Sequence, residues 1–286
     1  MKFPRIGRNS ALVCIVMSAP LALSAQTNCD EGAGTLNSAP PQGITTQQVI
    51  EKFAAREAIF RQARNNYTYT QDVTVQTLDG NTVDGEFRQV WDITYDDKGG
   101  RVENVTFAPQ SSLQRVTMTK EDFDDIRNRL PFVLTTEDLP QYDVLYAGAQ
   151  HVDDIDTYVF DLAPKRIEKG QRYFQGRVWV DNRDFQIVKT CGKNVPDIHA
   201  EGKKKKNVDE NLTPSFVTYR EQIDGEYWFP TYTRADDVLH FRNGDIHIRE
   251  IIKYANYKRF GAKTRIIFKG EVKDDPSQPP ATTKKP

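Results

Sequence analysis

The sequence predicts a mainly β protein of the α+β class, built on one large antiparallel sheet. Ten short segments alternate apolar and polar residues with the period of two that half-buried strands show. Turn residues such as Asp79-Gly80 and Asp224-Gly225 separate these segments, as in hairpins. Two segments with a helical period complete the pattern. One precedes the first strand and the other lies in the middle of the chain.

The N-terminus has the order of a secretory signal peptide. Lys2, Arg5 and Arg8 precede an apolar stretch, residues 11–23, which ends in small residues. We therefore expect residues 1–25 to be removed and the mature protein to be periplasmic or secreted, in the cell envelope. A membrane-spanning helix needs about 20 apolar residues, and no later segment reaches that length, so no transmembrane span is expected after cleavage.

The rest of the chain divides by composition. Residues 26–43 are rich in Gly, Pro, Ser and Asn, which predicts a flexible leader, and residues 273–286 predict a disordered tail in the same way. Residues 44–272 between them contain no internal repeat and have a length that all-β domains often fill as one unit. We therefore expect a single β domain over 44–272.

The charge balance excludes one class of partner. Without residues 1–25 the chain keeps 36 basic and 40 acidic residues, a net charge of about −4. Nucleic-acid binding depends on a basic surface that replaces the counterions of the phosphates. No nucleic-acid partner is expected.

The first helix of the domain is predicted from its start signal. Thr45 and Gln48 have the spacing of a capping box, in which each side chain satisfies a free backbone N–H of the first turn. The apolar residues that follow share one helical face: Val49, Ile50, Phe53 and Phe60. We expect this face to pack on the sheet.

The strands follow from Tyr67 onward. In residues 86–95, Phe87, Trp91, Ile93 and Tyr95 point one way and the polar residues the other. The other runs with this pattern are Tyr67–Leu78, Arg101–Phe107, Thr157–Leu162, Tyr173–Asp181, Phe185–Cys191, Phe216–Ile223, Tyr227–Arg234, Asp245–Tyr254 and Thr264–Phe268.

A second helix interrupts the strands. Thr119 can cap it, Phe123, Ile126 and Leu130 share a face, and Pro131 ends it. The apolar connection that follows, residues 132–140, fits a lid, a wall over one end of the sheet, or plain core.

Catalytic and metal-binding patterns are not found in the sequence. His240, Asp245, His247 and Glu250 are close in sequence, but strand alternation puts His247 and Glu250 on opposite faces, so they do not converge as metal ligands must. No nucleophile elbow and no phosphate-binding glycine loop is present. We therefore expect no enzyme activity, no catalytic residue, no metal and no cofactor.

Two further features leave alternatives open. Cys29 and Cys191 remain in the mature chain and could form one disulfide in an oxidising compartment, but their spacing does not say whether the side chains meet. The lysine run 203–206 fits either a solvated loop or a contact with an anionic surface.

Three segments carry a family resemblance: Tyr158–Pro164 (YVFDLAP), Gly176–Lys189 (GRVWVDNRDFQIVK) and Phe216–Pro230 (FVTYREQIDGEYWFP). They resemble the exported lipoprotein-carrier superfamily, which includes the outer-membrane lipoprotein-sorting proteins. The resemblance implies an incomplete β-barrel, a curved sheet with helices packed across its open side. It also implies a hydrophobic cavity that receives acyl chains, and no catalytic residues.

Two functions are compatible with these features. The first is a carrier or sensor of a hydrophobic ligand, such as lipoprotein acyl chains, in the cell envelope. Its candidate wall residues are Trp91, Ile93, Phe160 and Val178, which lie on largely apolar strand faces. The alternative is an envelope protein-interaction or regulatory module on the same scaffold, since one fold can carry unrelated functions.

Overall fold

The protein was analysed as a computed structural model. It describes residues 28–96, 98–128, 132–197, 211–241 and 243–260. The predicted signal peptide, the predicted tail, the lysine run 203–206 and the predicted strand Thr264–Phe268 lie outside the described residues. Within the described part of the chain, no helix is both long and apolar enough to cross a bilayer.

The described residues form one ten-stranded antiparallel sheet with the strand order β3-β2-β1-β10-β9-β8-β7-β6-β5-β4. The strands are β1 (Tyr67–Asp79), β2 (Thr82–Tyr95), β3 (Arg101–Phe107), β4 (Tyr142–Val152), β5 (Ile155–Pro164), β6 (Tyr173–Asp181), β7 (Ile187–Val195), β8 (Phe216–Ile223), β9 (Tyr227–Phe241) and β10 (Gly244–Arg259). Every neighbouring pair except β1–β10 is consecutive in sequence.

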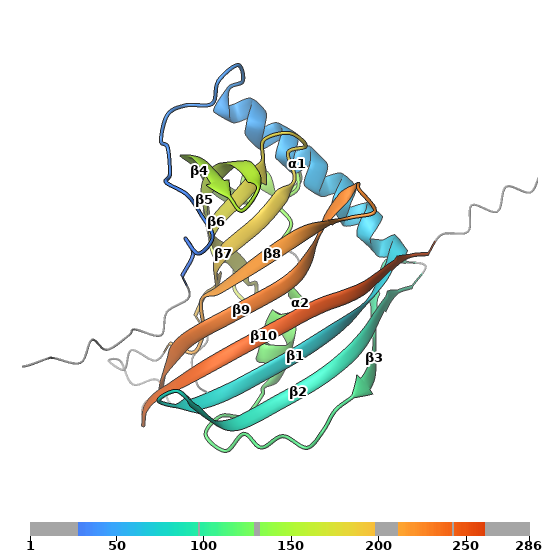
Figure 1. Cartoon of the computed structure of the whole chain (residues 1–286), viewed down its shortest axis with the longest axis vertical. Helices are drawn as coiled ribbons and strands as arrows, with labels where there is room; N and C mark the ends of the chain where they lie inside the picture. Colours follow the sequence, from blue (N-terminus) through green and yellow to red (C-terminus); the bar gives the residue numbers. More distant parts are fainter. Residues whose placement is uncertain (1–27, 97, 129–131, 198–210, 242, 261–286) are drawn as a thin grey trace, which may run out of the picture.

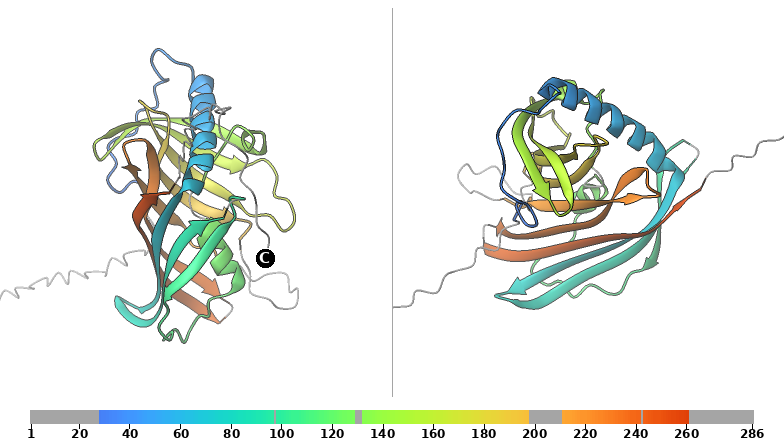
Figure 2. Two further views of the ribbon diagram at one scale, coloured as in Figure 1. Left: turned by 90° about the vertical axis from the view of Figure 1, so that its right-hand side faces the viewer. Right: turned by 45° about the horizontal axis from the view of Figure 1, so that its top comes forward.

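The sheet curves into an incomplete barrel. β3 and β4 are its two edges, and they do not pair with each other. The helix α1 (Thr46–Ala63) runs along the open side, and α2 (Lys120–Asn128) lies inside the curve (Figure 1). The second view of Figure 2 shows α1 spanning the opening between the two ends of the sheet. The predicted fold class, mainly β with helices across the open side of a curved antiparallel sheet, is confirmed.

The start of α1 is the predicted capping box. Gln48 N donates to Thr45 Oγ1 (3.2 Å), and Thr45 N donates to Gln48 Oε1 (2.9 Å). The predicted apolar face of the helix is buried, with Phe53 fully covered and its ring 5.4 Å from that of Phe160 on β5. The helix therefore covers the β4–β8 part of the concave face.

A buried ion pair fixes α1 to the sheet. Glu57 on α1 and Arg220 on β8 have 0% and 1% of their side-chain surfaces exposed. Arg220 Nη1 donates to both carboxylate oxygens of Glu57, at 3.2 and 3.3 Å. Glu57 also accepts a hydrogen bond from the backbone N–H of Ile187 at 3.2 Å, and Arg220 donates to the carbonyls of Ile187 and Phe132. The pair thus ties four separate segments together: α1, β7, β8 and the connection that contains Phe132.

The predicted second helix is α2, and Phe123 and Ile126 of its predicted apolar face pack inside the curve, while Leu130 and Pro131 lie outside the described residues. Ile126 is buried in one cluster with Trp91 and Ile93 of β2. The connection that follows α2 contributes to the core, since Leu134 is fully buried and the Phe132 ring lies 4.3 Å from that of Phe174. A short 3₁₀ helix (Leu139–Gln141) ends this connection at β4.

One strand was missed in the sequence. β4 is an edge strand, and its register with β5 shifts between Tyr146 and Gly148. Its apolar residues do not alternate cleanly, because Leu145 is 67% exposed while its neighbours are half-buried. An edge strand with an irregularity does not show the period of two by which the other strands were predicted.

The described part of the predicted leader, residues 28–43, is attached to the sheet. Cys29 forms a disulfide with Cys191 of β7. Two isolated β-bridges join Ala33 to Val152 and Asn37 to Ala149, so this segment adds to the β4 edge. Composition alone predicted a flexible leader, but a covalent link and backbone hydrogen bonds hold its described residues on the face opposite to α1.

Candidate functional site

Two cavities open on the concave side of the sheet, and α2 separates them. The larger has a volume of about 820 Å³ and includes Asp125 of α2 in its lining. The smaller has a volume of about 250 Å³ and includes Ile126, the next residue of the same helix. Their linings differ in chemistry.

The smaller cavity is largely apolar. It lies between α2, the connection that precedes it, and strands β1, β9 and β10. Its apolar lining residues are Val75, Val116, Met118, Ile126, Leu212, Pro214, Leu239, Phe241 and Ile248. Of these, Leu239 and Phe241 are half-buried, so part of their surface faces the open space. This cavity can take an apolar group.

The four predicted wall residues are on the concave face, in two separate clusters. Phe160 and Val178 are fully buried under α1, and Trp91 and Ile93 are buried under α2 with 2% and 0% of their surfaces exposed. None of the four lines either of the two cavities. They are packed core residues, and the apolar lining comes from neighbouring positions that were not predicted as wall residues.

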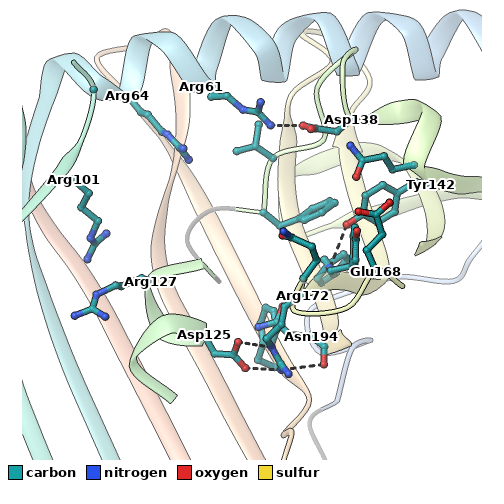
Figure 3. A pocket seen from close by; sticks show the side chains of 18 of the residues that line it. Arg61, Arg64, Arg101, Asp125, Arg127, Asp138, Tyr142, Glu168, Arg172 and Asn194 are labelled. Carbon is teal, nitrogen blue, oxygen red and sulfur yellow. Dashed lines mark hydrogen bonds and ion pairs between the residues drawn. The ribbon is translucent and has the colours of Figure 1, made fainter. Parts of the chain in front are cut away.

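The larger cavity is rich in arginine. Five arginines from different elements line it (Figure 3): Arg61 on α1, Arg64 in the 3₁₀ turn after α1, Arg101 on β3, Arg127 on α2 and Arg172 before β6. Three acidic residues, Asp125, Asp138 and Glu168, also line it. This arrangement was not predicted, because the arginines are spread over more than 100 residues and form no local motif.

Four of the five arginines have carboxylate partners. Arg61 pairs with Asp138, and Arg172 pairs with Asp125 at 2.7 Å. Arg101 and Arg127 share Glu103 of β3, at 2.8 and 2.9 Å. Arg101 also donates to the Tyr69 hydroxyl at 2.7 Å, and Arg127 pairs with Asp124 at 3.1 Å. These contacts fix the guanidinium groups in place.

Arg64 differs from the other four. Among the described residues, no hydrogen bond or ion pair engages its guanidinium group, and its Nε is shielded from solvent without a partner. Burial lowers the pKa of Arg64, the nearby hydroxyls of Tyr95 and Tyr69 act in the opposite direction, and the cations of Arg61 and Arg220 lower it further. Figure 3 shows the side chain reaching into the cavity.

The tyrosines around the cavity are neutral hydrogen-bonding groups. Burial raises the pKa of Tyr142 to about 12, and burial also raises the pKa of Tyr69. Their hydroxyls therefore keep their protons at neutral pH and add no negative charge beside the arginines.

The shared carboxylate predicts a pH effect on stability. Burial raises the pKa of Glu103, but hydrogen bonds from Arg127 and Arg101 outweigh burial and hold the pKa below its ordinary value of 4.5. Such a group stabilises the protein fully above 4.5, and this contribution is lost as the pH falls through the lower folded value. We expect the free energy of unfolding, measured by urea titration, to fall more steeply below pH 4.5 in the wild type than in Glu103→Gln.

The matched control is Glu121→Gln, since Glu121 is exposed on the same helix as Arg127. This variant should keep the steep fall of the wild type. Equal pH profiles for Glu103→Gln and the wild type would contradict the role given to Glu103.

The histidines considered in the sequence form carboxylate pairs. His240 Nδ1 lies 2.8 Å from Asp245 Oδ1, and His247 Nε2 is bonded to Asp236, which Arg249 also contacts. Within the described ranges, no group of three or more His, Cys, Asp or Glu side chains is arranged to hold a metal ion. These residues stabilise the β9–β10 ladder, where His247 pairs with Val238.

Comparison with known proteins gives a likeness in fold. No family model and no curated protein matches the chain. Matching solved structures include a DUF1329 family protein from Desulfovibrio piger, 17% identical over 74% of this chain and 92% of that chain, with a TM-score of 0.35.

Two other matches come from the group that the sequence resembles. A LolA superfamily protein from Nitrosomonas europaea is 15% identical, with coverages of 79% and 99% and a TM-score of 0.32. A putative outer membrane lipoprotein-sorting protein domain from Vibrio parahaemolyticus is 11% identical, with coverages of 74% and 93% and a TM-score of 0.34. At these values the likeness concerns the fold alone, and function has to be argued from the two cavities.

Proposed function

We propose that this chain is an exported, non-enzymatic binding protein of the cell envelope that holds the acyl chain of a hydrophobic ligand on the concave face of its sheet. The observation that carries the proposal is the apolar cavity between α2 and the ends of β9 and β10. Ligand sites of this kind are concave, mostly apolar and formed before the ligand arrives. The signal-peptide pattern in the sequence and the resemblance to lipoprotein carriers agree with it.

The size of the cavity limits the ligand. Its volume of about 250 Å³ is just below the range of about 300–1,000 Å³ that is typical of small-molecule sites. One acyl chain, or part of one, fits this space better than a whole lipid. Polar residues also line the cavity, among them Thr119, Asp122 and Glu250, so it is compatible with a chain that carries a polar group at one end.

Filling the cavity should block binding. Leu239 lines it and is only half-buried, so a tryptophan can occupy the empty space beside it without displacing core residues. We expect Leu239→Trp to weaken binding of a fluorescent fatty-acid probe by about tenfold or more, since the lost burial of two or three methylene groups is worth about 2 kcal/mol.

The control is the same change at Leu145. This residue is 67% exposed and lies on the edge strand β4, which does not line the apolar cavity. Leu145→Trp should bind the probe as the wild type does. Both variants should give the wild-type far-UV circular dichroism spectrum. If Leu239→Trp binds the probe with wild-type affinity and its fold is intact, the acyl chain does not bind in this cavity and the proposal is contradicted.

A second candidate function, docking of an envelope protein, is favoured by the edge strand β3. This strand ends the sheet, and its residues Val102, Val105 and Phe107 are all close to half exposed. An exposed apolar edge strand is a surface to which a partner chain can add. Native mass spectrometry of the protein purified from its host envelope separates the candidates: a bound acyl-chain mass favours the carrier, and a stoichiometric protein mass with no lipid favours docking.

A further inference from the structure

The arginine-lined cavity contains a cation, Arg64, that has no ion-pair partner among the described residues. The Nε of Arg64 is shielded from solvent, the residue as a whole is half-buried, and no described residue forms an ion pair or hydrogen bond with its guanidinium group. Removing a charge from water without a partner is unfavourable, and such groups are usually paired in folded proteins. An anion placed beside Arg64 would remove this penalty.

Two further guanidinium groups lie on the same wall. Arg101 and Arg127 share the single carboxylate of Glu103, and in Figure 3 both lie on the side of the cavity that also bears Arg64. Asp124, the second carboxylate that pairs with Arg127, is substantially exposed. We call Arg64, Arg101 and Arg127 the arginine wall.

The geometry of the wall suits an oxyanion. Guanidinium groups present N–H donors in a planar fork that matches the oxygens of a carboxylate or a phosphate. Arg101 is already oriented by Glu103, the Tyr69 hydroxyl and the Gln71 side chain, so little ordering is required of it when a ligand binds. The Tyr95 side chain lines the same cavity.

We propose that the arginine wall binds a carboxylate or phosphate group, with Arg64 as the residue that requires it. This inference rests on the proposed function in one respect: the oxyanion is assigned to the head of the ligand whose acyl chain enters the apolar cavity. Asp125 and Ile126 are adjacent on α2 and each lines one of the two cavities, so the proposal assigns the head and the acyl chain to neighbouring cavities on the two sides of this helix.

The test compares one acyl probe with and without its negative charge. The purified protein, stripped of bound lipid, is titrated with a fluorescent fatty acid and with the methyl ester of the same probe. We expect the wild type to bind the acid more tightly than the ester. Arg64→Gln should weaken binding of the acid by about tenfold, the usual effect of losing a charged hydrogen bond, and change ester binding by less than about twofold.

Arg183→Gln is the control, since it removes the same charge from an exposed turn between β6 and β7. It should bind both probes as the wild type does. Arg64→Gln should also unfold at a temperature no lower than that of Arg183→Gln, because no described residue is paired with the charge that it removes. A clear loss of stability would instead give Arg64 a structural role and overturn the inference.

Titration with inorganic phosphate alone distinguishes the sources of the anion. Displacement of the acid probe by phosphate in the wild type, but not in Arg64→Gln, would show a site that takes a free oxyanion. If the wild type binds the acid probe more tightly than the ester, but phosphate does not displace the acid probe, the site accepts the anion only as a lipid head. Equal binding of acid and ester by the wild type, with no calorimetric signal for phosphate, would overturn the inference while leaving the acyl-chain proposal standing. If neither acyl probe binds but phosphate binds through Arg64, the proposed function fails and the anion site remains.

Discussion

Replacing Glu57 with alanine is expected to lower the free energy of unfolding by about 3–5 kcal/mol, because it leaves Arg220 charged and buried without its carboxylate. The same change removes the acceptor of the Ile187 N–H, a buried backbone donor. Urea unfolding followed by circular dichroism measures the loss. The effect is large for one side chain because α1, β7 and β8 all meet at this carboxylate.

Glu51→Ala is the matched control. Glu51 is exposed on the same helix, and its side chain accepts a hydrogen bond from the neighbouring Gln47 side chain. Surface changes of this kind usually alter stability by less than about 0.5 kcal/mol. A loss below about 1 kcal/mol for Glu57→Ala would contradict the buried pairing. Replacing both partners by apolar residues, Glu57→Leu with Arg220→Met, should recover part of the loss, since no buried charge is then left alone.

Reduction of the Cys29–Cys191 disulfide should produce the second large effect. The two cysteines are 162 residues apart, and in the chain-entropy model a link of this span stabilises the folded protein by about 5 kcal/mol. We expect dithiothreitol to lower the thermal unfolding temperature and to increase hydrogen exchange in residues 28–43. Those residues otherwise depend on a few backbone hydrogen bonds, such as Gly34 N–H to the His151 carbonyl.

The double variant Cys29→Ala with Cys191→Ala should behave as the reduced protein does, and dithiothreitol should have no effect on it. Lys189 provides an independent measure of leader release. Its side chain is buried between the Trp179 and Tyr219 rings, and its Nζ donates to the Glu31 carbonyl. Detachment of the leader should therefore change the fluorescence of Trp179. Identical unfolding temperatures with and without reductant would show that the leader contributes little.

The elements whose conformation depends on local sequence, the first helix and most of the strands, were predicted correctly. The capping box at Thr45 involves residues three positions apart, so it could be predicted without any tertiary information. The alternation of β1 corresponds directly to its burial, in which buried and half-buried residues alternate over most of the strand. The Trp91 and Ile93 side chains point to the concave face, as expected. Helix α2 packs over both of them, and this contact could not be predicted from the sequence of their own strand.

The arginine wall was not predicted from the sequence, because it too depends on contacts between segments that are far apart in the chain. An oxyanion site made by Arg64, Arg101 and Arg127 exists only because the curve of the sheet brings the end of α1, β3 and α2 together. No spacing rule connects these positions. The disulfide is similar, since the sequence identified both cysteines but their pairing depends on the path of the leader across β4 and β7. A surplus of arginine over lysine in residues 56–127 was the one signal that could have directed attention to this region.

The order of strands determines when the sheet can be completed. Strands β4 to β10 each pair with the strand next to them in sequence, but β1 is joined to the rest only through β10, with Tyr67 opposite Arg259. A chain made from its N-terminus therefore exposes α1 and the β1–β3 hairpins long before their partner exists. Pairings of such long sequence separation form slowly. Among the described residues, β10 is the last strand in the chain and the one that joins the two parts, so α1 and β1–β3 must stay free of aggregation until β10 has been made.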